Sequence, residues 1–312
     1  MAKNFGIGQR DSMRAAAAIL TESRERGGLS YSTVATLLSR FEKFNNFAKS
    51  EGINRLDHMT RSLVLEYTAT LRASGYSPAY QQNLLSAVNT VLKLGYERED
   101  SRWDPVSAKE EHLPSRSNIR TVPTTNLDQL LAALPAMPER AAAVAKLARA
   151  FGLRSKEAAL LDAKNALKEA ERRGAITISN GTKGGLSRQV GITHQWQVTA
   201  LEHVVALQGS GNALIPPGKN WSQFRAQELK AGRKALKQQG ISGYHDLRAA
   251  YAADRYQVLT GHAAPCNQEG RCTANQQSDY SARMQISREL GHSRVSVTVA
   301  YLGGRRCQFA GK

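Results

Sequence analysis

Residues 290–304, LGHSRVSVTVAYLGG, place a histidine and a tyrosine at a spacing that one helix cannot explain. His292 and Tyr301 are nine residues apart, about two and a half turns, so a straight helix would put them on opposite faces. Packing against one core therefore does not account for the pair. A turn between them, followed by a short helix, would bring both side chains to one site. The rest of the chain decides whether such a site is expected.

The net charge is the first feature of the composition that bears on function. The 312 residues include 43 Lys and Arg against 26 Asp and Glu, a net charge of +17, and 41% are hydrophobic. A chain of this length can bury a sizeable core in one large or two medium domains. Residues 1–120 hold 17 basic and 13 acidic side chains, a net of +4, which leaves +13 for 121–312. This excess favours a polyanionic partner, usually nucleic acid, bound mainly by the second part.

The composition also bears on compartment. Three cysteines, Cys266, Cys272 and Cys307, are too few for a disulfide framework in a chain this long, which favours a reducing compartment. No apolar run approaches the ~18 residues of a membrane span. The first residues, MAKNFGIGQRDSMR, lack the apolar core of a signal peptide. We therefore expect a soluble, cytoplasmic protein without a membrane partner.

Helical periodicity dominates the first part of the chain. An Ala-rich segment at 11–26 is followed by SYSTVATLLSRFEKFNNFAKSEG, in which apolar residues recur at helical spacing. The stretches RSLVLEYTATLRASG and SPAYQQNLLSAVNTVLKLGY each open near a Ser or Thr, as helices do. Four or five packed helices, without a strand, are predicted for an N-terminal domain at 1–105.

The second part combines helices with one predicted hairpin. In SRWDPVSAKEEHLPSRSNIRTVPTT, three prolines interrupt the apolar pattern, which indicates a linker at 106–124. Amphipathic helices then surround AITISNGTKGGLSRQVGIT, whose alternating pattern around NG and GG predicts a β-hairpin. The fold class is therefore mainly α with a small β-sheet (α+β): a helical N-terminal domain joined by a linker to a larger domain at 125–312.

Four short pieces of the second domain carry side chains with convergent chemistry. FGLRSKEAALL holds Arg154 and, one turn on, Glu157, while NGTKGGLSRQV holds Lys183 at the tip of the predicted hairpin. GYHDLRAAYA holds His245 and Arg248 on one face of a helix start, where backbone N–H groups attract phosphate. The fourth piece is the stretch quoted first. Each of the first three pieces alone also fits a structural role: a buried Arg–Glu pair, a solvated turn lysine, or a capping histidine beside a surface arginine.

Together these side chains describe metal-free attack on a phosphodiester. Two arginines can hold a phosphate bidentately and stay charged at any working pH. A lysine with cationic neighbours can protonate a departing oxygen. Two histidines can hydrogen-bond non-bridging oxygens or move a proton, and a tyrosine can supply a nucleophilic hydroxyl. Since no acidic cluster is suited to Mg²⁺, cations of the protein would stabilise the transition state, and we expect no cofactor.

The pieces GLRSKE, TKGG, HDLR and LGH, with Tyr301 nine residues beyond that histidine, resemble the catalytic signature of the tyrosine recombinases, the phage-integrase family. The resemblance covers most of 125–312 in motif order. It implies a catalytic domain there and a core-DNA-binding domain at 1–105. It further implies a site-specific recombinase or integrase that cleaves and rejoins double-stranded DNA at a specific core site. Reciprocal exchange of two duplexes needs four cleavages, so a homotetramer on DNA is the family expectation.

By motif position, the resemblance implies roles for individual residues. Arg154 and Arg248 would hold the scissile phosphate, and Lys183 would protonate the leaving 5′-oxygen. Tyr301 would be the nucleophile that forms a 3′-phosphotyrosyl link. Because this link conserves the free energy of the phosphodiester, rejoining would need no nucleotide cofactor.

The remaining roles concern proton transfer and support. His245 would assist proton transfer at Tyr301, and His292 would contact a non-bridging oxygen of the phosphate. Glu157 would support the site without reacting. A tight turn near Ser293 would bring Tyr301 back towards His292.

Two features depart from the family pattern. Residues 262–278, HAAPCNQEGRCTANQQS, lengthen the distance between the HDLR and LGH pieces and are interpreted as an insertion. Cys266, Cys272 and nearby His262 could suggest a metal site, but their irregular spacing is a poor zinc signature, and we favour a mobile polar loop. Only eleven residues follow Tyr301, which is short for a C-terminal helix exchanged between protomers.

Two surfaces are candidates for DNA contact. RAQELKAGRKALKQQG carries five cations against the single acid Glu228: Arg225, Lys230, Arg233, Lys234 and Lys237. Such a run is as often a solvated helix face, but beside a DNA site it would add salt-dependent affinity with little sequence information. In the N-terminal domain, one helix start could approach a groove: Tyr76, Ser77, Tyr80, Gln81 and Gln82.

Two other functions stay open. A type IB topoisomerase uses the same tyrosine chemistry but relaxes DNA as a monomer, and the compact helical first part favours a recombinase. A non-catalytic DNA-binding accessory protein of the same fold is a different class, and the presence of all six site residues argues against it. The rival nucleophiles are Tyr251, Tyr256 and Tyr280, none of which follows LGH.

Overall fold

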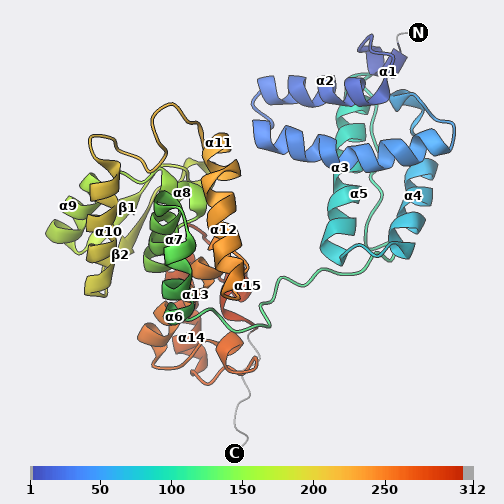
Figure 1. Ribbon diagram of the computed structural model, residues 1–312. Coiled ribbons are helices and arrows are strands. Elements are labelled where there is room, and N and C mark those ends of the chain that lie inside the picture. Colours follow the sequence, from blue (N-terminus) through green and yellow to red (C-terminus); the bar gives the residue numbers. More distant parts are fainter. Residues whose placement is uncertain (1–2, 305–312) are drawn as a thin grey trace, which may run out of the picture. The chain divides into compact units, whose positions relative to one another are not determined.

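Four long helices form the N-terminal unit of the computed structural model, which describes residues 3–304. They are α2 (Ser12–Glu25), α3 (Tyr31–Ser50), α4 (Arg61–Ala73) and α5 (Pro78–Glu97), with the short α1 (Lys3–Gly6) before them and a 3-10 helix at Leu56–His58. Each long helix begins with a side chain that caps its first turn: Asp11, Ser30, Thr60 and Ser77. In Figure 1, α2 and α3 lie side by side, and α5 crosses both. The prediction of a helical first unit without a strand is therefore confirmed for residues 3–117.

Apolar side chains from α3, α4 and α5 fill the centre of this unit. Phe41 and Phe44 are fully buried, and the rings of Phe44 and Tyr67 meet with centroids 5.2 Å apart. Leu84 and Val88 of α5 complete this core. The helical periodicity of the sequence thus corresponds to one buried face on each helix.

The described chain divides into two compact units between Ser117 and Asn118. This boundary falls inside the expected linker at 106–124, but the segment is packed rather than free. Val106 and Leu113 are buried in the N-terminal core, while the backbone N–H of Arg120 donates to the carbonyl of Val299 at 2.9 Å. The assignment of the two units as a DNA-binding and a catalytic domain stays a prediction.

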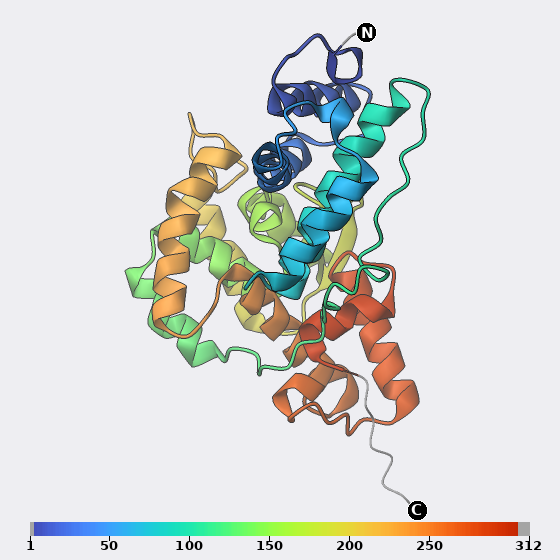
Figure 2. The ribbon, with the colours of Figure 1, turned by 90° about the vertical axis from the view of Figure 1, so that its right-hand side faces the viewer.

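The second unit is built around one alanine-rich helix. α7 (Glu139–Phe151) is buried on nearly every side, and α10 and α13 pack against it. The other helices of the unit are α6 (Leu127–Ala133), α8 (Ser155–Ala159), α9 (Ala163–Arg173), α10 (Gln195–Gln208), α11 (Trp221–Ala226), α12 (Glu228–Gln238), α13 (Tyr244–Thr260), α14 (Gln276–Glu289) and α15 (Val299–Leu302). Figures 1 and 2 show α11 at one end of this unit and α14 at the other. None of the helices in the described chain has both the length and the hydropathy needed to cross a bilayer.

The predicted hairpin is present as the small sheet of the fold. β1 (Ala175–Ile178) and β2 (Arg188–Gly191) pair antiparallel, with Ile176 opposite Val190 and Ile178 opposite Arg188. These four side chains share the buried face of the sheet, so a charged Arg188 lies in an apolar row. The predicted fold class, mainly α with a small β-sheet, is confirmed.

The segment 262–278 is a packed part of the second unit, so the expectation of a mobile polar loop is wrong. Ala264, Cys266 and Cys272 are buried in the core of this unit. Small Ala, Cys and Pro side chains can be buried without giving the apolar period that marks a core segment. Among residues 3–304, no three or more His, Cys, Asp or Glu side chains gather as they would around a metal ion. Cys307 and the rest of the tail from 305 onward lie outside the described residues.

We predict that Gly152→Ala lowers the free energy of unfolding more than Gly174→Ala does. Both glycines end helices in the left-handed region, at φ 62° and 63°. A Cβ at Gly152 would lie 2.5 Å from Cδ1 of Tyr251 and 2.8 Å from Cδ2 of Leu290, whereas at Gly174 it would meet nothing within 4 Å. Backbone strain should cost about 1–2 kcal/mol in both variants, and overpacking about 1–3 kcal/mol more in Gly152→Ala. Equal losses in urea titrations would contradict this account.

Candidate active site

Arg154 and Glu157 open the site at the junction of α7 and α8. α7 ends at Gly152, and Arg154 then caps α8, where Oε2 of Glu157 accepts from the backbone N–H of Arg154 at 2.8 Å. Oε1 of the same carboxylate accepts from Nη1 of Arg154 at 2.6 Å. The guanidinium is thereby oriented, while about a quarter of the Arg154 side chain (27%) stays exposed. The Arg–Glu pair predicted from the sequence is thus formed, and the Glu157 carboxylate holds the Arg154 guanidinium in place.

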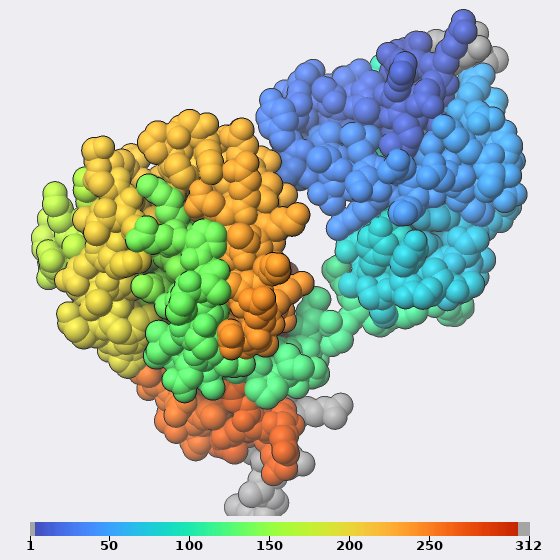
Figure 3. All heavy atoms as spheres, viewed as in Figure 1, coloured from blue at the N-terminus to red at the C-terminus, as the bar shows by residue number. Residues whose placement is uncertain are grey.

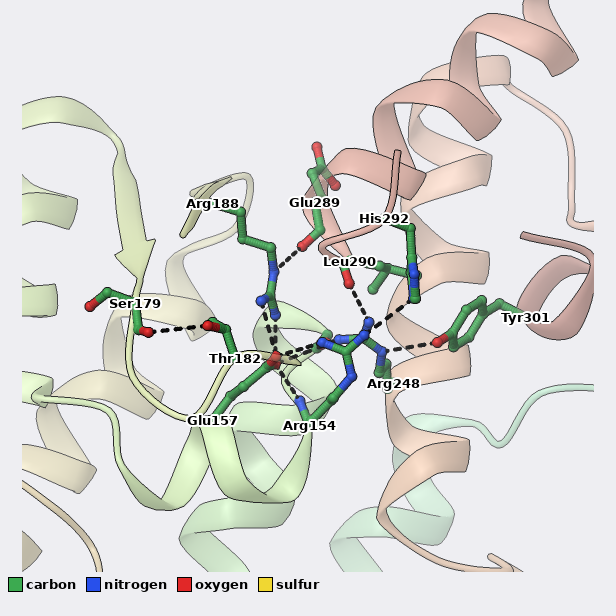
Figure 4. Close-up of polar contacts among 11 residues, drawn as sticks. Arg154, Glu157, Ser179, Thr182, Arg188, Arg248, Glu289, Leu290, His292 and Tyr301 are labelled. Carbon is green, nitrogen blue, oxygen red and sulfur yellow. Dashed lines mark hydrogen bonds and ion pairs between the residues drawn. The ribbon is translucent and has the colours of Figure 1, made fainter. Parts of the chain in front are cut away.

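Arg188 is a site residue that sequence reasoning did not assign. It donates to both oxygens of Glu157, at 3.1 and 2.6 Å, and through Nε to the carbonyl of Glu289 at 2.7 Å (Figure 4). Burial alone would raise the pKa of Glu157, but the hydrogen bonds and charge of Arg188, together with Arg154, lower it below the ordinary value. The signal in the sequence was an arginine at an inward position of an alternating strand.

Arg248 lies at the centre of the site and is fully buried. It projects from the second turn of α13, and two arms of its guanidinium donate to the carbonyls of Gly152 and Leu290. Its Nε donates to the hydroxyl of Tyr301 at 3.3 Å. Arg248 therefore joins the end of α7, the end of α14 and the helix α15. In this arrangement the hydroxyl of Tyr301 accepts from Arg248, whose guanidinium we expected to bind a phosphate.

His292 follows the end of α14 and meets Arg154. Its backbone N–H donates to the carbonyl of Ser287 at 2.7 Å, which fixes the turn. Nη2 of Arg154 donates to Nε2 of His292 at 3.3 Å, a contact that requires the neutral ring to accept there. Two residues 138 positions apart thus form one face of the site (Figure 4).

We predict that His292 titrates at about pH 4 instead of near 6.5. Burial lowers its pKa first, and the charges of Arg248, Arg154, Arg188 and Lys183 lower it further, to about 4. The ring should therefore be neutral throughout pH 6–8. NMR titration of the ring protons measures this pKa, and Lys183→Ala should move the midpoint upward because one cation is removed. A midpoint near 6.5 in the parent protein would contradict the prediction.

Tyr301 returns to the site as the spacing of its sequence suggested. After His292 the chain turns, forms a 3-10 helix at Val295–Thr298 and continues into α15. The ring centroid of Tyr301 lies 6.3 Å from that of His292 and 5.3 Å from that of His245. The predicted turn that brings the tyrosine back is therefore confirmed. Its side chain is buried, and its hydroxyl accepts from Arg248.

His245 and Lys183 lie at the margin of this group. His245 is exposed at the start of α13, and its pKa is lowered by partial desolvation first and then by the charge of Arg248. Lys183 is exposed in the loop between β1 and β2, and within residues 3–304 its amine has no hydrogen-bond or ion-pair partner. Its charge still acts on His292. The structure thus gathers five of the six predicted residues, with Lys183 nearby on a loop.

The three rival tyrosines occupy other settings. The hydroxyl of Tyr251 donates to Glu289 at 2.8 Å, and that of Tyr256 donates to Asp279 at 2.8 Å. Both are buried, and burial with the neighbouring carboxylate raises the pKa of each hydroxyl. Tyr280 is exposed on the surface of α14. In the described chain, none of the three hydroxyls forms a hydrogen bond with Arg154, Arg188 or Arg248.

The basic stretch RAQELKAGRKALKQQG (225–240), which covers the end of α11 and all of α12, lies on the surface of the second unit. Figure 3 shows α11 and α12 on its outside. Four of the five predicted cations are exposed: Arg225, Lys230, Lys234 and Lys237. Arg233 differs, because it is half-buried and its guanidinium lies 6.0 Å from the ring centroid of Tyr244. Glu228 pairs instead with Lys219, at 3.2 Å, so the exposed cations are not neutralised by the one acid of the helix.

At the helix start predicted to approach DNA, several side chains form hydrogen bonds within the first unit itself. Ser77 caps α5, and the buried Gln81 donates to the carbonyl of Tyr76 at 2.9 Å. Gln82 donates to the carbonyl of Pro114 at 2.8 Å. Tyr76 stays exposed, and its ring meets that of Tyr80 edge to face.

Comparison with known proteins supports the resemblance. Residues 115–254 match the family model described as integrase, a range that includes Arg154 and Arg248 and ends before His292. The fold is similar to that of a lambda integrase dimer bound to a COC′ core site, with 15% identity, a TM-score of 0.60, and coverage of 95% of this chain and 98% of that one. It is also similar to a Tn1549 transposon integrase in complex with transposon right end DNA, with 12% identity, a TM-score of 0.57, and coverage of 93% and 95%.

A third similar structure is a lambda integrase tetramer bound to a Holliday junction, with 15% identity, a TM-score of 0.59, and coverage of 96% of this chain and 78% of that one. No curated protein sequence matches the chain. The family match and the shared fold confirm the resemblance to tyrosine recombinases that the sequence motifs indicate.

Proposed function

We propose that this chain, which has the fold of the tyrosine recombinases, is a site-specific DNA recombinase. It would cleave and rejoin strands of double-stranded DNA through a 3′-phosphotyrosyl intermediate. The observation that carries this proposal is the hydroxyl of Tyr301 on Nε of Arg248, with Arg154 and His292 beside it. A nucleophile and two guanidiniums in one place suit phosphoryl transfer, because the developing charge on the phosphate needs fixed cations.

The scissile phosphate would bind where the tyrosine hydroxyl now lies, and the Tyr301 side chain would rotate off Nε of Arg248 while the backbone of α15 keeps its place. Two arms of the Arg248 guanidinium are occupied by the carbonyls of Gly152 and Leu290, so Nε is the donor that a phosphate oxygen can reach. Arg154 is partly exposed and already fixed by Glu157, which leaves it able to hold a second oxygen. His292, neutral at pH 7, would donate an N–H to a non-bridging oxygen.

The chemical step exchanges one phosphate ester for another. The phenolic oxygen of Tyr301 attacks phosphorus, the bond from phosphorus to the 5′-oxygen breaks, and the phosphate stays on the 3′ end as a tyrosyl ester. His245, whose pKa is lowered, would accept the phenolic proton, and Lys183 would give a proton to the departing 5′-oxygen. Attack by a 5′-hydroxyl reverses each transfer and reseals a strand. We propose that the protein needs neither metal nor nucleotide for this step.

The partner in this proposal is duplex DNA with a core site. The exposed cations Arg225, Lys230, Lys234 and Lys237 would contact the phosphate backbone. The three DNA-bound integrases of similar fold support this partner, and the tetramer among them supports assembly of four protomers on two duplexes. The N-terminal unit would serve as the core-DNA-binding domain and the second as the catalytic domain.

The proposal is tested by covalent trapping without metal. The protein is incubated in EDTA with a randomised library of nicked duplexes, whose cut strand cannot be resealed, followed by DNA flanking its gene. We expect SDS-resistant adducts whose DNA shares one core sequence. Tight binding without any adduct would favour the non-catalytic alternative. Relaxation of supercoils by the monomer at unrelated sequences would favour the topoisomerase alternative.

A further inference from the structure

The helix that carries Tyr301 is too short to hold its own position. α15 spans only Val299–Leu302, and a single helical turn is unstable without outside contacts. The geometry of the nucleophile is therefore set by the segments that touch α15 from elsewhere in the second unit. One of them is the part of the chain that follows the boundary between the units.

Arg120 in this segment contacts two elements of the site at once. Its backbone N–H donates to the carbonyl of Val299 at 2.9 Å, at the first residue of α15. Its guanidinium donates through Nη1 to Oδ1 of Asp246 at 3.1 Å, in the first turn of α13. The ion pair is shielded, since the Arg120 and Asp246 side chains are only 10% and 16% exposed. The same residue thus joins the helix of Tyr301 to the helix of His245 and Arg248.

The conformation of Arg120 is itself fixed. Nε and Nη2 donate to the carbonyls of Val122 and Pro123, at 3.0 and 2.9 Å, so the side chain folds back on its own segment. Oδ2 of Asp246 is held independently by the backbone N–H of Ser242 at 2.9 Å. Each of the three guanidinium nitrogens of Arg120 therefore has a defined partner, and the ion pair with Asp246 of α13 is held in one geometry.

The chain just after Tyr301 packs closely against two other segments. Gly303 has φ 86°, and a Cβ there would lie 3.1 Å from the carbonyl oxygen of Arg120 and 2.9 Å from the backbone nitrogen of Cys266. On the same side, Sγ of Cys266 donates to the carbonyl of Tyr301 at 3.5 Å. α15 therefore lies between the segment of Arg120 and the segment 262–278 and forms hydrogen bonds with both.

We propose that Arg120 is a positioning residue for strand cleavage, which holds α15 against the first turn of α13 and so fixes Tyr301 beside His245 and Arg248. This inference rests on the proposed function. Arg120 does not react in this account. Its loss should leave DNA binding in place and slow the attack of the tyrosine, since a misplaced nucleophile loses rate steeply with distance.

The test compares Arg120→Ala with Arg116→Ala in the full chain. Arg116 is an exposed arginine four residues earlier, so both variants lose one positive charge from the same connection. At saturating nicked duplex, we expect adduct formation in Arg120→Ala to be about 10–100-fold slower than in Arg116→Ala, with similar DNA affinity in both. Equal rates in the two variants would overturn the proposal. Absence of adducts in the parent protein would instead overturn the proposed function.

A second substrate separates nucleophile positioning from proton donation. A duplex with sulfur in place of the 5′-bridging oxygen has a leaving group that needs no proton, so it should restore cleavage by Lys183→Ala. It should not restore cleavage by Arg120→Ala, and restoration there would overturn the proposal.

The single variant Asp246→Asn keeps the proposal testable if Arg120→Ala fails to fold. Asp246→Asn keeps the size of the side chain but removes the charge that Arg120 contacts, and it should also slow cleavage at saturating DNA. With a folded Arg120→Ala, the double variant should be no slower than Arg120→Ala alone, because both changes break one contact. An Asp246→Asn protein that folds and cleaves at the parent rate would contradict the proposal.

Discussion

Tyr301→Phe is expected to reduce strand cleavage to background while leaving the fold and the DNA affinity of the protein unchanged. The change removes one oxygen atom, whose contact in the described chain is the hydrogen bond from Nε of Arg248. The phenyl ring keeps its packing beside His245 and His292. Enzymes that lose their nucleophile lose on the order of 10⁶-fold in rate, because the remaining groups act only through it. Single-turnover adduct formation on nicked duplex measures the loss.

The matched control for this variant is Tyr280→Phe. Tyr280 is exposed on the surface of α14, so its hydroxyl should be dispensable for cleavage. Tyr251 and Tyr256 donate to carboxylates and have raised pKa values, which makes them poor nucleophiles. Adducts that persist in Tyr301→Phe and vanish in Tyr280→Phe would show that the nucleophile has been assigned wrongly.

Glu157→Gln is expected to lower the free energy of unfolding of the protein strongly. Glu157 is fully buried, accepts two hydrogen bonds from Arg188 and one from the Arg154 guanidinium, and lies 3.7 Å from Nη1 of Arg248. Glutamine keeps the shape but removes the charge that balances these arginines. Breaking a buried pair in this way costs about 3–5 kcal/mol, because the partner charge stays buried without compensation. The free energy of unfolding from urea titration measures the loss.

A surface glutamate supplies the control for this prediction. Glu269 pairs with Arg271 at 2.9 Å, and both side chains are largely exposed, so Glu269→Gln should change stability by about 0–1 kcal/mol. The pH dependence gives a second check. Because the folded pKa of Glu157 lies below the unfolded 4.5, its contribution is complete above 4.5 and is lost as pH falls through the folded pKa. Similar losses in both variants at pH 7 would contradict the account.

The sequence predicted those parts of the fold that depend on local patterns. The starts of two helices were found because a Ser or Thr side chain lies at each, and the hairpin because apolar residues alternate on either side of NG and GG. The return of Tyr301 to His292 followed from nine residues of spacing. These features are encoded within about twenty residues of chain.

Contacts between distant segments could not be predicted in the same way. Arg188 pairs with Glu157 across 31 positions, and Arg120 pairs with Asp246 across 126. Arg188 lies in the quoted piece NGTKGGLSRQV but was given no role there, and Arg120 lies in the expected linker, because a charged residue in a strand or linker is usually solvated. The packing of 262–278 was missed because its buried residues are small. The complete burial of Arg248, with two arms on backbone carbonyls, also depends on the tertiary fold.

The most direct test of the account is to identify the residue that is joined to DNA. Trypsin should release Tyr301 in VSVTVAYLGGR, whereas Tyr251, Tyr256 and Tyr280 fall in three other peptides: AAYAADR, YQVLTGHAAPCNQEGR and CTANQQSDYSAR. Adducts trapped on nicked duplex in EDTA are digested with trypsin and nuclease and analysed by mass spectrometry. We expect a nucleotide linked through phosphate to the tyrosine of VSVTVAYLGGR. A nucleotide on any other peptide, or tight DNA binding with no linked peptide at all, would contradict it.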